Sequence, residues 1–179
     1  LSADANTAII GGFQDNSGIG AAWIFTRSGN IWTQQGNKLI GTGAIGNATQ
    51  GSAVAINADG NTVIIGGSND DVFAIPFAPK GAAWIFIRNS GVWSQQGNKL
   101  VGTGSPDAAT QGASVSISAD GSSAVVGGPS DRINAGAAWL YKRISGIWSQ
   151  NGNKLQGSFV TGNSYVGNSV AMSANGNEV

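Results

Sequence analysis

Residues 83–100 read AWIFIRNSGVWSQQGNKL, and close copies of this stretch occupy residues 22–39 and 138–155. A second shared stretch, NADGNTVIIGG at 57–67, also recurs with each copy, and SANGNEV at 173–179 begins a fourth. The chain is therefore a repeat array, and each residue must be judged against its repeat before a function is assigned to it.

The repeat boundaries follow from one slot, which Ser2, Asn57, Ser118 and Ser173 occupy at steps of 55, 61 and 55 residues. The middle step is longer because six extra residues lie within 68–81. An insertion confined to one slot marks a loop on one face of a repeat assembly. We assign residues 1–179 to a single array: repeat 1 at 2–56, repeat 2 at 57–117, repeat 3 at 118–172 and the start of repeat 4 at 173–179.

Each repeat contains four strand-like segments, which in repeat 2 are 51–58, 61–67, 82–88 and 91–96. They are rich in β-branched and aromatic residues, and short turns such as Asp59-Gly60 join them as hairpins. We predict an all-β fold with almost no helix and three four-stranded antiparallel sheets, each holding the AWIF-type strand between its neighbours. Four antiparallel strands per repeat describe a β-propeller blade, which must stack on other blades to bury its two apolar faces.

The segments QGSAVAI, ADGN, IIGG or VVGGP, GAAWIF and WSQQGNKL resemble the FG-GAP repeat family. These repeats form the propellers of integrin α-subunit heads and of many bacterial surface proteins, and the resemblance covers the whole chain. It implies a secreted or cell-surface location. The family's DxDxDG-like calcium loop is absent, and DNSG (15–18), DDVF (70–73) and DRIN (131–134) stand in its place. We therefore expect no tightly bound calcium.

Three sheets cannot close a propeller, for which at least four blades are needed. We expect the chain to be a piece of a larger propeller, the alternative being assembly with other copies of itself. The isolated piece should then not be a stable monomer. The segment 164–172 should form a strand that adds to a neighbour's sheet edge.

The composition excludes several classes of function. The chain has 179 residues, of which 10% are charged, and its net charge is zero. A nucleic-acid partner needs a basic face, and a membrane span needs about 20 apolar residues in a row, so we expect neither. His and Cys are absent, which removes the commonest general base and all thiol chemistry. We expect no catalytic residues, no enzyme activity and no cofactor.

Six Trp residues occupy two repeated slots: Trp23, Trp84 and Trp139 in one, Trp32, Trp93 and Trp148 in the other. A large residue repeated in every unit usually packs between units. We predict that Trp23, Trp84 and Trp139 are largely buried between adjacent sheets. The alternative is that repeated indoles bind sugars, as in a lectin propeller.

Most charged residues also lie in slots that hold the same residue in every repeat, and we call such residues repeat-locked. The shared slots hold Arg27, Arg88, Arg143, Lys38, Lys99, Lys154, Asp4, Asp59, Asp120, Asp15, Asp70 and Asp131. The residues Asp4, Asp59 and Asp120 lie in hairpin turns, where a carboxylate can accept a hydrogen bond from its own backbone as an Asx-turn.

The ligand-binding candidates are Asp15, Asp70 and Asp131, which follow the GG pair in each repeat, together with Asp71, which only repeat 2 carries. A cation site normally needs several oxygen ligands, and each loop offers one carboxylate. The alternative is that the carboxylate forms an Asx-turn, which orders the loop. The apolar insertion VFAIPFAP (72–79), which only repeat 2 carries, either makes a contact specific to that repeat or caps a sheet edge.

The leading interpretation is a noncatalytic extracellular propeller scaffold or binding module for proteins, with a carbohydrate-binding lectin propeller as the alternative. Its partner would be a protein or glycan at the surface, and self-association or continuation of the same chain is expected.

Overall fold

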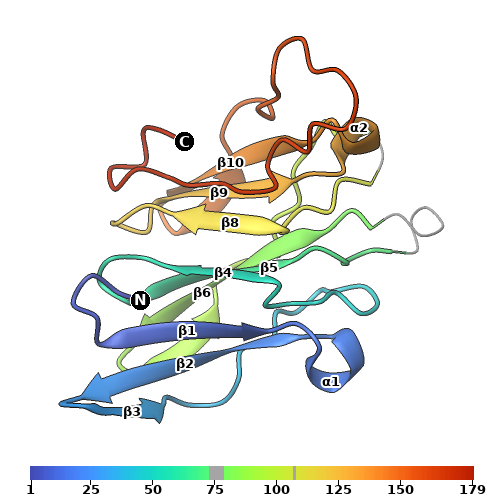
Figure 1. The fold of residues 1–179 in the computed structure, drawn as a ribbon. Helices are drawn as coiled ribbons and strands as arrows, with labels where there is room; N and C mark the ends of the chain where they lie inside the picture. The colour runs from blue at the N-terminus through green and yellow to red at the C-terminus, as the bar shows by residue number, and fades with distance from the viewer. Residues whose placement is uncertain (73–78, 107) are drawn as a thin grey trace.

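The computed structural model describes residues 1–72, 79–106 and 108–179, and it shows an all-β protein of three stacked antiparallel sheets (Figure 1). The first sheet contains β1 (Thr7–Gly12), β2 (Ala21–Ser28) and β3 (Ile31–Gln34). The second contains β4 (Ala53–Ile56), β5 (Thr62–Gly67), β6 (Ala82–Asn89) and β7 (Val92–Gln95). The third contains β8 (Ser114–Ile117), β9 (Ser123–Gly128), β10 (Ala137–Ile144) and β11 (Ile147–Gln150).

Each sheet keeps its strands in chain order, and the AWIF-type strands β2, β6 and β10 lie between two neighbours, as predicted. In the second sheet, Trp84 of β6 stands opposite Ile65 of β5. The turn before β5 is an Asx-turn, because the Asn61 N–H donates to Asp59 Oδ1 over 2.8 Å. Asp4 and Asp120 accept the equivalent bonds at 3.0 and 2.9 Å, which confirms the predicted role of this slot.

The prediction of three four-stranded sheets is wrong for the first sheet, which has three strands. Ser2 occupies the slot that follows a repeat's first strand, so the first sheet begins with β1, which is the equivalent of β5 and β9. Helix is limited, within the described residues, to the four-residue turns α1 (Asp15–Gly18) and α2 (Asp131–Asn134), both of which contain residues with positive φ.

The segment 164–172 was predicted to form a strand on a neighbour's sheet edge, which a structure of one chain does not test. This segment makes one isolated bridge, between Val166 and Gly136, and otherwise runs along the third sheet without strand structure. The first strands β4 and β8 are strands because they pair with β5 and β9. The segment 164–172 has no such second strand among the described residues, so no ladder can form.

Two apolar cores lie between the sheets. The core between the first and second sheets includes Ile24, Leu39, Val63, Ile65, Trp84 and Phe86. The core between the second and third includes Ile64, Ile85, Leu100, Val126, Trp139 and Tyr141. The second sheet is therefore buried on both faces, which explains why all six residues of β5 are buried.

The linkers between repeats lie against these cores. An added Cβ at Gly41 would meet Trp84 Cδ1 at 2.1 Å, and one at Gly102 would meet Trp139 Cδ1 at the same distance. Glycine is required at these two positions because the linker backbone rests directly on the indole of the next sheet. The buried amide of Gln50 fixes the same point, since it accepts from the Gly41 N–H and donates to the Gly41 carbonyl.

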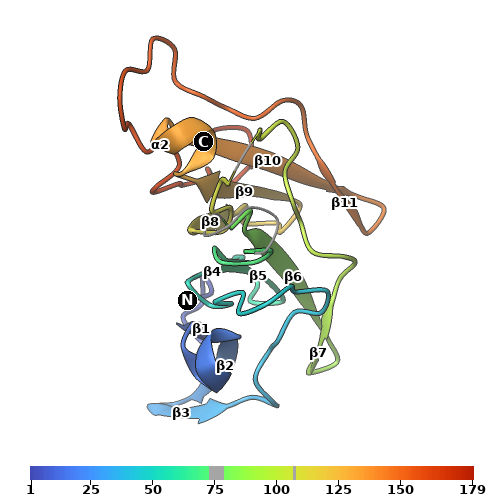
Figure 2. The ribbon, with the colours of Figure 1, turned by 90° about the vertical axis from the view of Figure 1, so that its right-hand side faces the viewer.

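Neighbouring repeats are also joined by one repeated backbone hydrogen bond near their first strands. The Ala58 N–H donates to the Ala119 carbonyl over 3.0 Å, and the same slot links Ala3 to Ala58 and Ala119 to Ala174 at 2.9 Å. The strand β4 lies against β8, whereas β7 and β11 lie on the opposite side of the stack (Figure 2). Each new sheet therefore joins the previous one at its first strand.

Candidate functional site

The predicted ligand-binding residues Asp15, Asp70 and Asp131 lie in three separate loops on one side of the stack, at α1, after β5 and at α2 (Figure 1). The structure does not bring them together. Within the described ranges, it contains no group of three or more Asp, Glu, His or Cys side chains placed to hold a metal ion.

Each of these carboxylates forms an ion pair with the lysine of the NKL stretch in its own repeat. The pairs are Lys38–Asp15, Lys99–Asp70 and Lys154–Asp131. The carboxylates therefore order their loops, but not as the Asx-turns that the sequence suggested. The two residues of the pair are 29 residues apart in repeat 2 and 23 in the other two. The ion pair therefore forms in repeat 2 despite the six extra residues between its partners.

A second contact connects two of the carboxylates to the preceding linker. The Ile45 N–H donates to Asp70 Oδ1 over 2.7 Å, and the Ser105 hydroxyl donates to Asp131 Oδ1 over 2.6 Å. The side chains of Asp70 and Asp131 are 1% and 0% exposed, whereas that of Asp15, on the first sheet, is 25% exposed. A cation would have to displace a lysine from each of these sites.

The remaining candidate, Asp71, pairs with Lys80 over 3.2 Å across the base of the insertion. Its φ of 58° places it in the left-handed region. The apolar insertion at 72–79 was predicted to be a private contact or a cap, and residues 73–78 of it lie outside the described part of the chain.

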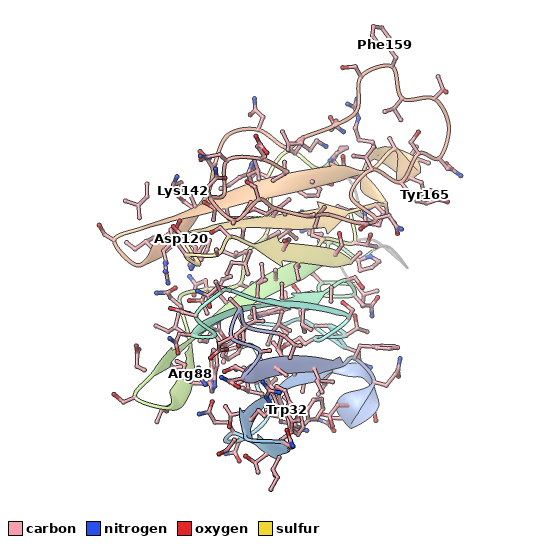
Figure 3. All side chains as sticks on the ribbon, turned by 60° about the vertical axis from the view of Figure 1, so that its left-hand side comes forward. Trp32, Arg88, Asp120, Lys142, Phe159 and Tyr165 are labelled. Atoms are coloured by element: carbon pink, nitrogen blue, oxygen red, sulfur yellow. The ribbon has the colours of Figure 1, made fainter. Side chains whose placement is uncertain are left out.

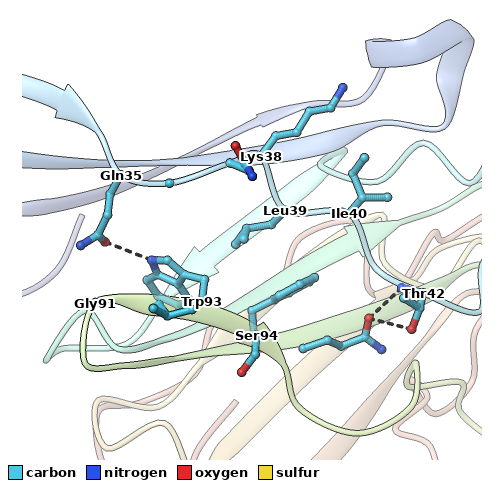
Figure 4. Close-up of a pocket in the computed structure, with 13 residues that line it drawn as sticks. Gln35, Lys38, Leu39, Ile40, Thr42, Gly91, Trp93 and Ser94 are labelled. Atoms are coloured by element: carbon cyan, nitrogen blue, oxygen red, sulfur yellow. Dashed lines mark hydrogen bonds between the residues drawn. The ribbon is translucent and has the colours of Figure 1, made fainter.

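The structure shows two equivalent grooves that the sequence did not reveal. The first, of about 470 Å³, lies between residues 35–42 of the first linker and β7 (Figure 4). The second, of about 250 Å³, lies between residues 96–100 and β11. The shared lining slots are Gln35 and Gln96, Asn37 and Asn98, Lys38 and Lys99, Leu39 and Leu100, Gly91 and Gly146, and Trp93 and Trp148.

The second Trp slot forms one wall of these grooves. Trp93 donates from Nε1 to Gln35 Oε1 over 3.1 Å (Figure 4), and Arg88 lies over its ring at 5.3 Å and donates to the same oxygen. Trp148 donates to Gln96 over 2.9 Å in the same way. An indole edge, an amide and a charged group in one groove can bind a polar ligand with apolar faces.

The first Trp slot has a different environment. Trp84 and Trp139 are fully buried, and their Nε1 atoms donate to the carbonyls of Thr42 and Thr103 over 2.9 and 2.8 Å. The prediction of burial between sheets is confirmed for these two. It is wrong for Trp23, which is half-buried, because no linker lies on its indole in the part of the chain that the structure describes.

Three exposed apolar side chains lie in α2 and in the segment that follows the third sheet. Ile133, Phe159 and Tyr165 are 82%, 99% and 45% exposed, and all three have a positive φ of 51–56°. Tyr165 donates its N–H to the Asn134 carbonyl, and Phe159 lines a hollow of about 350 Å³ with Arg132. Figure 3 shows Phe159 pointing away from the body of the molecule. We name these four residues, Arg132, Ile133, Phe159 and Tyr165, the third-repeat rim.

The rim departs from the other repeats. The slot of Phe159 holds Gly43 and Gly104 in repeats 1 and 2, with φ of 76° and 82°. The slot of Tyr165 holds Thr49 and Thr110, which have a positive φ as well, so Tyr165 departs in its side chain alone. A bulky residue with positive φ is strained, and strain of this kind clusters at functional sites. In the sequence, this difference is visible as Phe159 in a slot that holds glycine in the other two repeats.

Scans against protein-family models and against curated proteins give no match. Among solved structures, the chain is similar to TolB from Acinetobacter baumannii, with 14% sequence identity and a TM-score of 0.48. The match covers 98% of this chain and 34% of the TolB chain, so the chain spans about a third of the length of that protein. Among the described residues, no helix has both the length and the apolar character that crossing a membrane requires.

Proposed function

We propose that the chain is a noncatalytic β-propeller-type scaffold of the FG-GAP kind, which is secreted or displayed at the cell surface and binds a protein through the third-repeat rim. One observation carries the proposal. The contacts between sheets repeat from one interface to the next, whereas the rim places exposed Phe159 where the other repeats have glycine.

The repeated framework supports a scaffold role. Several of the residues that recur in every repeat bind one another or the preceding linker, as in Lys99 to Asp70 and Trp84 to Thr42. Side chains that hold neighbouring sheets in place are not available for proton transfer or nucleophilic attack. A fixed stack with variable loops is the arrangement by which repeat proteins present binding surfaces.

The rim supports a protein partner. Phe159 and Tyr165 are aromatic, and Arg132 adds a planar cation beside Phe159. Aromatic residues and arginine are the side chains that contribute most to protein interfaces. Because Phe159 is 99% exposed, its ring has little contact with the chain's own core.

The test is a binding screen of the chain against an array of secreted and cell-surface proteins, repeated with two variants. The variant Phe159→Gly restores the residue of repeats 1 and 2, so it should keep the fold and abolish the binding. The control Ile147→Ser removes another exposed apolar residue, 71% exposed, from a hairpin tip of the third sheet, and should bind as the wild type does. Equal binding by Phe159→Gly and the wild type would refute the rim as the site.

A second candidate function is glycan binding in the two equivalent grooves, each of which has a Trp wall and an exposed amide at Asn37 or Asn98. Sugars bind to such mixtures of aromatic and amide groups, and repeated sites give avidity. A glycan array followed by titration calorimetry tests this. The double variant Asn37→Ala/Asn98→Ala should weaken binding, whereas Asn153→Ala, in the same slot of repeat 3, should not.

A further inference from the structure

We infer that Asn47 is the acceptor of an N-linked oligosaccharide, which is attached to its side-chain nitrogen. The inference rests on the secreted or cell-surface location in the proposed function, because such glycans are carried by exported proteins. Residues 47–49 read Asn-Ala-Thr. An asparagine followed two residues later by serine or threonine, with no proline between them, is the acceptor triplet for this modification.

The triplet occurs once in the chain, and the repeat does not require it. In repeat 2 the slot of Asn47 holds Ala108, so the threonine of the triplet is present without the asparagine. In repeat 3 the slot holds Asn163, but Tyr165 stands where the threonine should be. Only repeat 1 therefore combines the two side chains that the modification needs.

The backbone of the triplet is held at the surface by both flanking repeats. The Asn69 side-chain amide donates to the Asn47 carbonyl over 2.9 Å, and the Asn69 N–H donates to the Thr49 hydroxyl oxygen over 3.3 Å. On the other side, the Thr49 N–H donates to the Gly18 carbonyl over 2.9 Å. These partners belong to the first two repeats, so both neighbours of the triplet are present in the structure.

The side chain of Asn47 is free, in contrast to its backbone. The residue is exposed, and within the described residues its side-chain amide makes no hydrogen bond. Asparagines with a structural role are bonded here: Asn57 accepts from the Thr62 N–H over 2.9 Å, and Asn61 accepts from Arg88 over 2.9 Å. A covalent bond to the nitrogen of Asn47 therefore leaves the hydrogen bonds of the fold intact.

The residue beside this amide has no side chain. A Cβ added at Gly18 would lie 3.6 Å from Asn47 Cβ and 3.8 Å from Asn47 Nδ2. The slot of Gly18 holds Pro79 in repeat 2 and Asn134 in repeat 3. Repeat 1 thus combines the acceptor triplet with a glycine neighbour, which leaves room for a bulky group on the nitrogen.

The reaction needs a lipid-linked oligosaccharide as the donor and an oligosaccharyltransferase of the exporting cell as the catalyst. A bond forms between Asn47 Nδ2 and the anomeric carbon of the first sugar. The bond between that carbon and the pyrophosphate oxygen of the donor breaks, and one proton leaves Nδ2. The chain supplies the acceptor alone, so the inference requires no catalytic residue in it.

The experiment is intact-mass spectrometry on the full chain, secreted by cells that contain an oligosaccharyltransferase. The wild type should be heavier than its 18.0 kDa polypeptide by one oligosaccharide. A peptide amidase specific for N-linked glycans should remove the added mass from the folded protein, because Asn47 is exposed, and should convert the asparagine to aspartate.

The variants separate the triplet from its surroundings. Asn47→Gln and Thr49→Ala should each have the mass of the bare polypeptide, whereas Thr49→Ser should keep the oligosaccharide. The controls Asn163→Gln and Thr110→Ala change the same slots in repeats 3 and 2, and both should keep it. Thr110 is a close match, because the hydroxyls of Thr49 and Thr110 each donate to the carbonyl of the preceding residue over 2.7 Å.

A secreted wild type with the mass of the bare polypeptide would overturn the inference, as would an oligosaccharide that persists in Asn47→Gln. Protein binding through Phe159, measured on the same samples, keeps the inference separable from the proposed function. Binding by a chain without the glycan would contradict the inference alone. A glycan on a chain that binds nothing through Phe159 would support the inference and contradict the role of the rim.

Discussion

The hydroxyl of Ser105 donates to the carboxylate of Asp131 in the place where, one repeat earlier, a backbone N–H of Ile45 donates to Asp70. Residue 106, which occupies the slot of Ile45, is proline and has no N–H to give. The side chain one position earlier supplies the missing donor. Two different donors thus satisfy the buried carboxylate of the same slot in two repeats, which shows how closely the interface constrains this point.

Replacing Ser105 with alanine should lower the free energy of unfolding by about 1.5–3 kcal/mol, the range for a hydrogen bond to a charged group. The variant leaves Asp131, which is fully buried, with one donor fewer. Adding Pro106→Ala restores an N–H in the slot of Ile45, so the double variant should recover part of the loss. Urea unfolding measures both, and a double variant no more stable than Ser105→Ala would contradict the donor exchange.

Trp84→Ala should cost about 3–5 kcal/mol, as expected for a fully buried large aromatic residue. The same change at Trp23 should cost much less, because Trp23 is half-buried and no linker rests on it in the described chain. Chemical unfolding of the two variants gives the comparison. Equal losses would mean that the linker adds nothing to Trp84, and an unchanged stability in Trp84→Ala together with loss of sugar binding would favour the lectin alternative.

Tyr141→Phe should stabilise the chain by about 1 kcal/mol, because a buried hydroxyl without a hydrogen bond is costly. The Tyr141 hydroxyl has no partner within the described residues, and burial raises its pKa above the ordinary value. The same slot holds Phe25 and Phe86 in the other repeats, so the ring alone fits. Tyr165→Phe, at an exposed position, is the control and should leave the thermal midpoint unchanged.

Calcium should not stabilise the chain, because each loop carboxylate already binds a lysine. We expect the same melting temperature with calcium and with a chelator. Asp70→Asn should cost about 3–5 kcal/mol, since it leaves Lys99 without its partner at a mostly buried site. Asp15→Asn, at a pair with 36% and 25% exposed side chains, should cost less than about 1 kcal/mol. A calcium-dependent rise in the midpoint that Asp70→Asn abolishes would show a metal site after all.

Acid should remove a small contribution from Asp120. Hydrogen bonds from Ser118 and Ser122 lower its pKa from 3.8 to about 2. A carboxylate whose pKa is lower in the folded state stabilises the fold above the unfolded pKa, and this contribution disappears as the pH falls from about 4 to about 2. The stability difference between wild type and Asp120→Asn should therefore shrink over that range. Asn175 makes the same Asx-turn in the fourth copy, so asparagine keeps the turn.

The strands and their order could be predicted from the sequence because the repeat fixes them locally. The Asp-Gly turns, the alternating apolar residues and the central AWIF-type strand need no long-range information. The burial of Trp84 could be predicted from its slot, but the exposure of Trp23 could not. Burial depends on what lies on the indole, and within the described residues no linker lies on that of Trp23.

The candidate site could be predicted only in part. The sequence singled out Asp15, Asp70 and Asp131 as repeat-locked, and it also showed the lysines as repeat-locked. It could not show that the two slots pair, because 23–29 residues separate them and the intervening strands decide their distance. The grooves were missed for the same reason, since each is formed by two repeats.

The ion pair between Lys99 and Asp70 closes a loop that is six residues longer than those of the neighbouring repeats. This ion pair holds the start of the loop in place, so the length of the loop does not affect the packing of the sheets. Evolution can lengthen such a loop without redesigning the framework, and so can an engineer. The slot after Asp131, closed by Lys154, is the natural place to graft a foreign peptide or a randomised library onto this chain.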